Sequence, residues 1–409
     1  MFIRIYNKRS KKKTIDNSKQ QKQDITNFPK QGDDEKISLR NSKYRPFDVD
    51  YAEDLKKNWP QIWKKGGNIE GNNQYRRLLP IIKRKDKSAQ TKTEEIAIKK
   101  REAWAARHIG NFRLAGVVAQ IKWFVISERG QKYMKELIND EKKRLSRERN
   151  RTWNNWIQKK QAPAEKKLQR SIYSYLKSAQ KRYKSRIKEY VTSEKNAGNY
   201  VIKSVVSWSE LLSIASEVDQ IILDFGPSWL AVWSLSGNEE LDEIYSQLNE
   251  TKPLNLTFGE RDLAISAIDF AAYKIAQTSA RNVKKIIEQG LLSGASTTQI
   301  AIAIDNAASF GFSRSVDIAR TESTKAINLA SNQSYQTAAN QGINIQKEWL
   351  SSRDEKVRHT HQELDGQIVG VNEDFTIPST GEKAPAPAAF KNPAESIRCR
   401  CTIIPVIND

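Results

Sequence analysis

The net positive charge of this 409-residue chain is confined to its first half, and this imbalance is the feature that most limits how the chain can fold. Residues 1–200 contain 51 Lys and Arg against 22 Asp and Glu, a net charge of +29. Residues 201–409 contain 18 against 26, a net charge of −8. At this length we expect two or three domains rather than one undivided core. The basic half should associate with polyanions, and nucleic acid, an anionic membrane or an acidic protein all fit its charge.

Apolar periodicity divides the chain into a tail and several folded segments. Residues 1–48 have almost no such periodicity, so nothing offsets the entropy of ordering the backbone, and we expect a disordered basic tail. Residues 49–139 are predicted to form a small helical module, residues 201–341 a helical platform, and residues 342–409 a small strand-containing module. The predicted fold is therefore mainly α with a small α+β C-terminal module, elongated and multi-domain.

Three local signals refine this prediction. Residues 94–138 have the outline of a helix–turn–helix DNA reader, but this outline has little specificity and we expect an ordinary helical hairpin. The pair Gly226-Pro227 predicts a break in the helical platform. The run at residues 296–298 can cap the helix that follows it.

Residues 140–200 are predicted to form two basic amphipathic helices separated at Pro163, because proline is tolerated in a first helical turn but not in an interior. Phosphates would take the charge of their basic side chains, and aromatic rings would stack on exposed bases. The alternative is a solvated face whose tryptophans pack against the rest of the protein. The candidate nucleic-acid-binding residues are Arg144, Arg147, Arg151, Trp153, Trp156, Lys159, Lys160, Lys177, Lys181, Lys184 and Lys188.

The C-terminal third carries a distinctive order of motifs. An Ala-Arg-Thr helix is followed by a tryptophan, by Asp and Arg before a histidine, by a Leu-Asp-Gly turn and by a terminal Cys-Arg-Cys. The motif residues with an expected structural role are Arg320, Trp349, Asp354, Arg358, Asp365, Gly366 and Arg400. In this order, over residues 270–407, the chain resembles the Mu F-like minor head proteins of tailed phages.

The resemblance implies a virion component that is assembled into the procapsid in the bacterial cytoplasm, near the portal vertex. Its partners would be the portal, scaffold or major capsid protein. The resemblance implies no catalytic activity, and it leaves the basic residues 1–200 unexplained.

The same third contains two pairs of metal-binding side chains. His359 and His361 are two residues apart, as are Cys399 and Cys401, so each pair shares a face if it lies on a strand. Two thiolates and two imidazoles form a complete ligand set for zinc. The spacing is tighter than usual, so we expect buried thiols that pack as small apolar side chains, with zinc as the alternative. Cysteines this close seldom form a disulfide, which suits a reducing cytoplasm.

The acidic and basic motif residues allow two interpretations. Asp354, Arg358 and Asp365 could form an acid/base or nuclease site, or a salt bridge beside the turn at Gly366, and we expect the second because a hydrolytic site needs more converging carboxylates. We therefore predict no enzyme and no cofactor other than the possible zinc. The apolar run at residues 117–126 is far shorter than the roughly 20 residues that span a bilayer, so we predict no membrane association.

Three functional hypotheses follow. The leading one is a minor head protein whose basic half binds double-stranded DNA without sequence preference. The second is an enzyme or effector domain within residues 51–200, appended to a phage head protein. The third is a structural portal or scaffold adaptor that makes no contact with DNA.

Overall fold

The computed structural model describes residues 49–66, 69–196, 199–205, 207–253, 258 and 261–408, together with residues 38, 39, 42 and 44. The predicted basic tail therefore lies outside the described residues except for those four positions. The described chain forms two compact units, and the division falls after Arg147, within a long helix. We call them the N-terminal unit and the C-terminal unit and describe each by itself.

The N-terminal unit is helical, and its core is built from apolar faces of short helices. Buried residues include Leu78, Val118 and Phe124, none of which exposes any surface. The apolar run at residues 117–126 lies in this core, as expected, but its helix ends at Lys122 rather than continuing. The helices are α1 (Val49–Asn58), α2 (Pro60–Trp63), α3 (Ile69–Lys83), α4 (Lys92–His108), α5 (Leu114–Lys122) and the first part of α6 (Glu128–Trp156).

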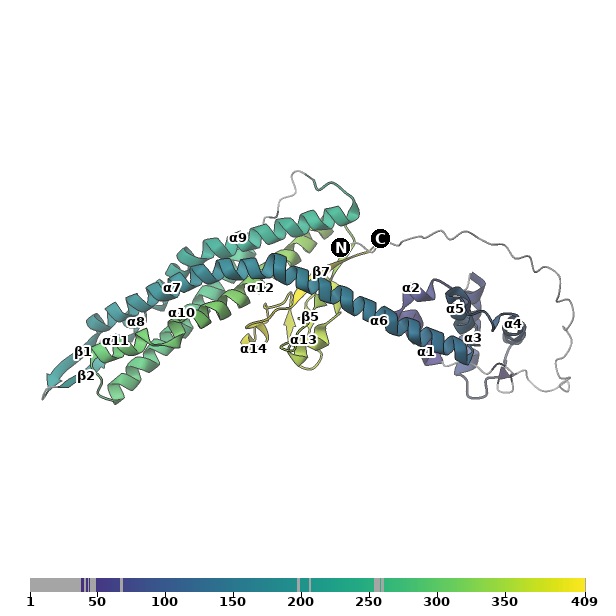
Figure 1. The fold of residues 1–409 in the computed structure, drawn as a ribbon, viewed down its shortest axis with the longest axis horizontal. Coiled ribbons are helices and arrows are strands. Elements are labelled where there is room, and N and C mark those ends of the chain that lie inside the picture. Colours follow the sequence, from purple (N-terminus) through teal and green to yellow (C-terminus); the bar gives the residue numbers. More distant parts are fainter. Residues whose placement is uncertain are drawn as a thin grey trace. The chain divides into compact units, whose positions relative to one another are not determined.

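The C-terminal unit is a bundle of long helices followed by a small sheet module, and this confirms the predicted mainly α fold with an α+β end (Figure 1). Its helical elements are the π-helical turn Ile157–Gln161, α7 (Ala162–Tyr190), α8 (Trp208–Leu212), α9 (Ile214–Leu248), α10 (Arg261–Leu292), α11 (Thr297–Asp305), the short 3-10 helix Ala308–Phe310, α12 (Phe312–Asn340), α13 (His359–Leu364) and α14 (Pro393–Ser396). Its strands are β1 (Val191–Asn196), β2 (Asn199–Val205), β3 (Ile345–Leu350), β4 (Ile368–Gly370), β5 (Phe375–Thr376), β6 (Lys383–Ala384) and β7 (Thr402–Ile407).

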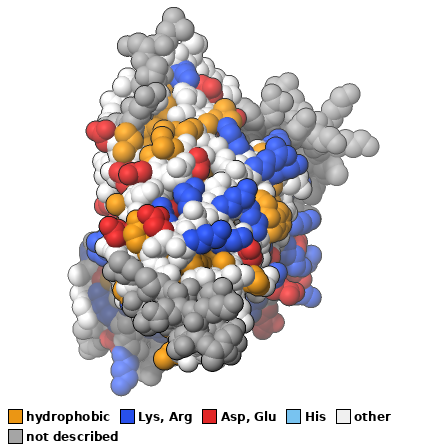
Figure 2. All heavy atoms as spheres, turned by 90° about the vertical axis from the view of Figure 1, so that its left-hand side faces the viewer, with side chains coloured by type: hydrophobic (Ala, Val, Ile, Leu, Met, Phe, Trp, Pro, Cys, Tyr) orange, Lys and Arg blue, Asp and Glu red, His pale blue; other side chains and the backbone are white. Residues whose placement is uncertain are grey.

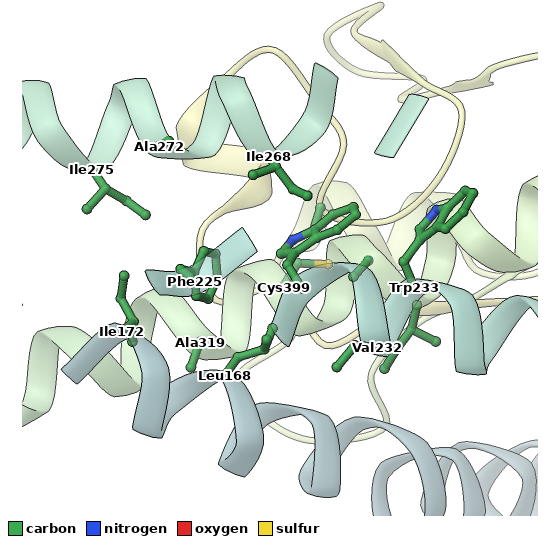
Figure 3. Packing of buried hydrophobic residues seen from close by; sticks show 14 of the residues in the cluster. Leu168, Ile172, Phe225, Val232, Trp233, Ile268, Ala272, Ile275, Ala319 and Cys399 are labelled. Atoms are coloured by element: carbon green, nitrogen blue, oxygen red, sulfur yellow. The ribbon is translucent and has the colours of Figure 1, made fainter. Parts of the chain in front are cut away.

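Helices α7, α9, α10 and α12 share one apolar core. Leu168 and Ile172 on α7 face Phe225 on α9, and Ile268 on α10 lies close by (Figure 3). The apolar stripe predicted on α7 is confirmed, because its residues at helical spacing are buried. Burying such a stripe stabilises a helix far more than its intrinsic propensity does.

Three local predictions come out differently. The helix α9 runs through Gly226-Pro227 without a break, so the expected interruption is wrong. A proline inside a helix costs about 3 kcal/mol or more, and the complete burial of Phe225 and Trp229 on either side offsets it. The two helices predicted on either side of Pro163 are α6 and α7, and Pro163 lies in the first turn of α7, but a π-helical turn joins the two helices without a loop. Finally, residues 191–196 and 199–205 form the strands β1 and β2, which pair antiparallel where a helical region was predicted.

The capping signal is confirmed. Ser296 precedes α11, and its side chain accepts a hydrogen bond from the Gln299 amide. The Gln299 side chain in turn accepts a hydrogen bond from the Ser296 amide, so two backbone donors are satisfied reciprocally.

The sheet module closes against α12. Strand β3 lies between β4 and β7, and both pairings are antiparallel. Trp349 on β3 pairs with Ile403 on β7 and is fully buried. Its ring meets Phe375 edge-on, with 5.2 Å between the ring centroids, a geometry that aromatic pairs prefer.

Candidate functional site

The motif residues converge where α12 meets the segment that leads into β7. Thr324 Oγ1 donates a hydrogen bond to the Cys399 carbonyl at 2.9 Å. Asn328 Nδ2 donates to the Cys401 carbonyl at 3.2 Å, and Asn328 Oδ1 accepts from the Ile403 amide at 2.9 Å. All five residues are buried. The motif helix therefore holds the backbone of the Cys-Arg-Cys segment from residue 399 to residue 403.

Asp365 binds two arginines and marks the start of a turn. One carboxylate oxygen lies 2.8 Å from Arg149, and the other lies 2.8 Å from Arg353. Burial opposes ionisation, but the Ser351 amide and Arg149 hold the pKa of Asp365 below its usual value. The next residue, Gly366, has φ of +83°, which glycine adopts without strain. The geometry fits a salt bridge and a turn.

The other motif residues also have structural partners. Arg320 on α12 pairs with Glu165 on α7 at 3.0 Å. Asp354 pairs with Arg400 at 2.7 Å. Arg358 was expected to have a carboxylate partner, but it donates to the main-chain carbonyl of residue 397 instead. The difference arises because Arg149 and Arg353 already occupy Asp365, and Arg400 occupies Asp354.

Three of the four proposed metal ligands come together. His361 Nδ1 lies 3.6 Å from Cys399 Sγ and 3.5 Å from Cys401 Sγ, and each of the three residues is 1% exposed. Burial opposes ionisation of Cys399, but hydrogen bonds from Cys401 and His361 hold its pKa well below the usual value. Burial and the neighbouring Cys399 raise the pKa of Cys401 well above the usual value.

His359, the fourth proposed ligand, lies outside this cluster. Its side chain is 86% exposed, and its ring contacts Glu363 at 2.9 Å. His359 and His361 lie in the short helix α13, not on a strand. Residues two apart on a helix point about 200° apart around its axis, so only His361 faces the cysteines.

The candidate nucleic-acid-binding residues fall into two groups. Trp153 and Trp156 are buried in the core of the C-terminal unit, and Trp153 Nε1 donates to the main-chain carbonyl of Arg400 at 2.8 Å. In this conformation their rings are not available to stack on bases. The structure therefore agrees with the alternative interpretation, in which the tryptophans pack against the rest of the protein. Several cations are also held by partners within the protein. Lys160 pairs with Glu240, Lys184 pairs with Asp305, Arg144 pairs with Glu141, and Lys177 donates to Gln180.

The second group remains open to solvent. It consists of Arg147, Arg151, Lys159, Lys181 and Lys188. Figure 2 shows Lys and Arg side chains near the middle of one face, beside hydrophobic side chains. The exposed cations are therefore available to a polyanion by electrostatic contact alone.

Sequence reasoning missed a basic cavity in the N-terminal unit. It has a volume of about 310 Å³, and its lining includes Lys56, Lys64, Arg76 and Lys122, with no acidic residue. Burial lowers the pKa of Lys122 to about 8, and its Nζ lies 4.8 Å from the centroid of the Trp63 ring. Three of the cations lie on α1, α3 and α5 and Lys64 follows the end of α2, so no spacing in the sequence reveals that they lie together.

The contacts described above define a small α+β module closed onto a long motif helix, and sequence comparison identifies its class. Residues 281–404 match the family described as Phage Mu protein F like protein, which confirms the resemblance for the C-terminal third.

Three curated relatives match parts of the chain. The NAD(+)-arginine ADP-ribosyltransferase EFV of Enterococcus faecalis is 29% identical over 242 residues, which cover 55% of this chain and 48% of that protein. The minor head protein GP7 of Bacillus phage SPP1 is 28% identical over 127 residues, which cover 31% of this chain and 41% of that protein. The uncharacterized protein YqbB of Bacillus subtilis is 29% identical over 142 residues, which cover 33% of this chain and 46% of that protein.

The chain thus spans less than half the length of each of these relatives. No solved structure matches it. Within the residues that the structure describes, no helix combines the length and the apolar character needed to cross a membrane.

Proposed function

We propose that this protein is a minor head protein that takes part in phage head morphogenesis and binds another head component, with the portal protein as the first candidate. The observation that carries the proposal is the match of residues 281–404 to the Mu F-like family. The structure supports a structural role for the motif, because Arg320, Asp354 and Asp365 form ion pairs that join separate elements of the fold.

An apolar groove in the C-terminal unit supports binding to a protein partner. It measures about 300 Å³ and is lined by residues of α10 and α12 and of the loop around α14. Phe270 on α10 is 51% exposed and Ile397 is 48% exposed at this groove. Exposed apolar side chains that gather in one place mark sites of protein association.

The test has two parts. Mass spectrometry of purified heads should detect the protein, and immobilised full-length protein should capture the portal protein after nuclease treatment. Phe270→Glu should weaken this capture, whereas Leu223→Glu, at a 70% exposed position on α9 outside the groove, should not. Absence of the protein from heads would contradict the head role, and equal capture by both variants would contradict the groove.

The exposed cations support a second element of the proposal, sequence-independent contact with double-stranded DNA. Lys181 and Lys188 project from α7 into solvent, and the basic cavity adds the exposed cations Lys56, Lys64 and Arg76. Binding through phosphate contacts weakens steeply with salt, with a slope of log K against log salt near −0.9 per phosphate.

The DNA proposal is tested by measuring this slope for the full-length protein. The double variant Lys181→Glu/Lys188→Glu should weaken binding equally on unrelated sequences and reduce the slope. Lys285→Glu, an exposed charge reversal on α10 in the acidic half, serves as the control. No retention of DNA at low salt would contradict DNA contact and favour a purely structural portal or scaffold adaptor.

The name of one relative supports a different candidate, an enzymatic activity. The E. faecalis relative is named an NAD(+)-arginine ADP-ribosyltransferase, and 55% of this chain aligns with it. The corresponding hypothesis places an appended enzyme within residues 51–200. Transfer of label from NAD to arginine-containing acceptors by the full-length protein would support the enzyme, and no transfer at high protein concentration would contradict it.

A further inference from the structure

We propose that Cys399, Cys401 and His361 bind one zinc ion, through both sulfur atoms and the imidazole Nδ1. The three ligand atoms lie within 4.8 Å of one another and are fully buried. The inference does not depend on a role in a phage head. Two thiolates and one imidazole suit zinc better than calcium or magnesium, which prefer oxygen ligands.

The two distances from the imidazole nitrogen to the sulfurs agree with a tetrahedral zinc site. Zinc binds cysteine sulfur at about 2.3 Å and histidine nitrogen at about 2.0–2.1 Å, so two such ligands at a tetrahedral angle lie about 3.6 Å apart. The separations of His361 Nδ1 from Cys399 Sγ and Cys401 Sγ are 3.6 and 3.5 Å. One nitrogen therefore lies almost equally far from both sulfurs, as a shared metal ion requires.

The surroundings of the three residues also fit a metal site. His361 Nε2, the ring nitrogen that faces away from the sulfurs, lies 3.1 Å from Glu395 Oε2. The hydroxyl of Thr360 donates to the same oxygen at 2.8 Å and so fixes the carboxylate. Histidines that bind metal commonly donate their second ring N–H to a carboxylate, which orients the ring. Here the carboxylate lies at the right distance, although Nε2 makes no hydrogen bond with the residues that the structure describes. The Ser352 amide donates a hydrogen bond to Cys401 Sγ at 3.4 Å, as amides do around metal-bound sulfur.

The backbone before the cysteines is held in a shape that presents both thiols to His361. Arg398 has φ of +58°, a left-handed conformation that costs energy for a residue with a Cβ. The Arg398 amide donates to Thr321 Oγ1 at 3.0 Å, and its guanidinium pairs with Asp317 at 2.6 Å. Together with the bonds from α12 to the carbonyls of residues 399 and 401, these contacts order the ligands before any ion binds.

Among the residues that the structure describes, three side chains supply ligands, which leaves one position of the tetrahedron to water. The ion would join α13 to the segment before β7, two elements separated by about 35 residues of chain. Because the bound ion would link these two elements, zinc binding should stabilise the folded sheet module.

The experiment measures bound metal in the full-length protein, purified under reducing conditions without chelator. We expect about one zinc per chain by elemental mass spectrometry. After exchange, cobalt(II) should give d–d bands typical of tetrahedral coordination and a thiolate charge-transfer band. His359→Gln is the matched control, because it removes the exposed histidine of the same His-X-His pair. It should retain the zinc, whereas His361→Gln and Cys401→Ser should lose it.

Glu395→Gln tests the geometry without removing a ligand. Mutation of such an outer carboxylate costs about 10-fold to 100-fold in metal affinity, so we expect a shift of this size in a competition titration with a chromophoric chelator. The proposal is overturned if the wild-type protein contains no zinc and gives no cobalt spectrum while both thiols titrate as free. A disulfide between Cys399 and Cys401 in the reduced preparation would overturn it equally.

Discussion

Replacing Asn328 by alanine tests whether α12 holds the Cys-Arg-Cys segment in place. The side chain is fully buried and bridges the Cys401 carbonyl and the Ile403 amide at 3.2 and 2.9 Å. Its loss leaves two buried backbone groups without these partners, at about 1–3 kcal/mol each. Alanine favours a helix over asparagine by roughly 0.5 kcal/mol, which offsets a small part. The net cost is about 3 kcal/mol.

The effect should be local, so the assay is hydrogen exchange by mass spectrometry on the full-length protein. Peptides that cover β7 should lose protection on the order of 100-fold, because 1.4 kcal/mol corresponds to about tenfold in an opening equilibrium. The control is Gln336→Ala, two turns further along α12. Gln336 is only half-buried and makes one long bond of 3.4 Å, to the Val371 carbonyl. A loss of protection of less than about threefold in the Asn328 variant would refute the reasoning.

Three further substitutions probe other buried polar groups. Burial lowers the pKa of Lys347 to about 8, so its charged form is disfavoured in the folded protein, and stability should rise by up to about 3 kcal/mol as the pH increases from about 8 to 10.5. Thermal unfolding midpoints should show a larger rise in the wild type than in Lys347→Met, which keeps the contribution of Lys122. Glu217 is unexposed and pairs with the half-buried Arg182 and Arg186, so Glu217→Gln should cost about 3 kcal/mol by leaving two partly buried positive charges without their carboxylate. Chemical denaturation measures this cost, with exposed Asp219→Asn as the unaffected control. Arg101 in the N-terminal unit donates to three main-chain carbonyls. Arg101→Leu should therefore sharply increase proteolysis of that unit, and unchanged cleavage would contradict this role.

Much of the architecture follows from periodicity along the chain. The apolar stripe from Leu168 to Tyr190 predicted an amphipathic helix with one buried face, and the structure has that helix, with only Tyr190 of the stripe half-buried. The Ser296 cap and the strand-containing C-terminal module were predicted for similar reasons, because capping and strand alternation are local patterns. The family resemblance was also visible, because it depends on the order of residues alone.

Predictions were less accurate where the outcome depended on contacts between residues far apart in the sequence. Pro227 marks a break by every local rule, yet burial of Phe225 and Trp229 keeps α9 intact. Trp153 and Trp156 follow a run of cations, a pattern typical of nucleic-acid contact, but they pack into the core of the C-terminal unit. Nothing in the local sequence distinguishes a tryptophan that stacks on a base from one that fills a core.

The sequence by itself determined the charge imbalance, the helical class and the family of the last third, because each is a property of composition or order. Only the tertiary structure decided which side chains share a site. It placed His361 between Cys399 and Cys401, left His359 in solvent, and brought Glu395 to the far side of the His361 ring. The positions of these atoms depend on how α12 and α13 pack against the strands. Contacts between elements far apart in the chain have no signature at any fixed spacing.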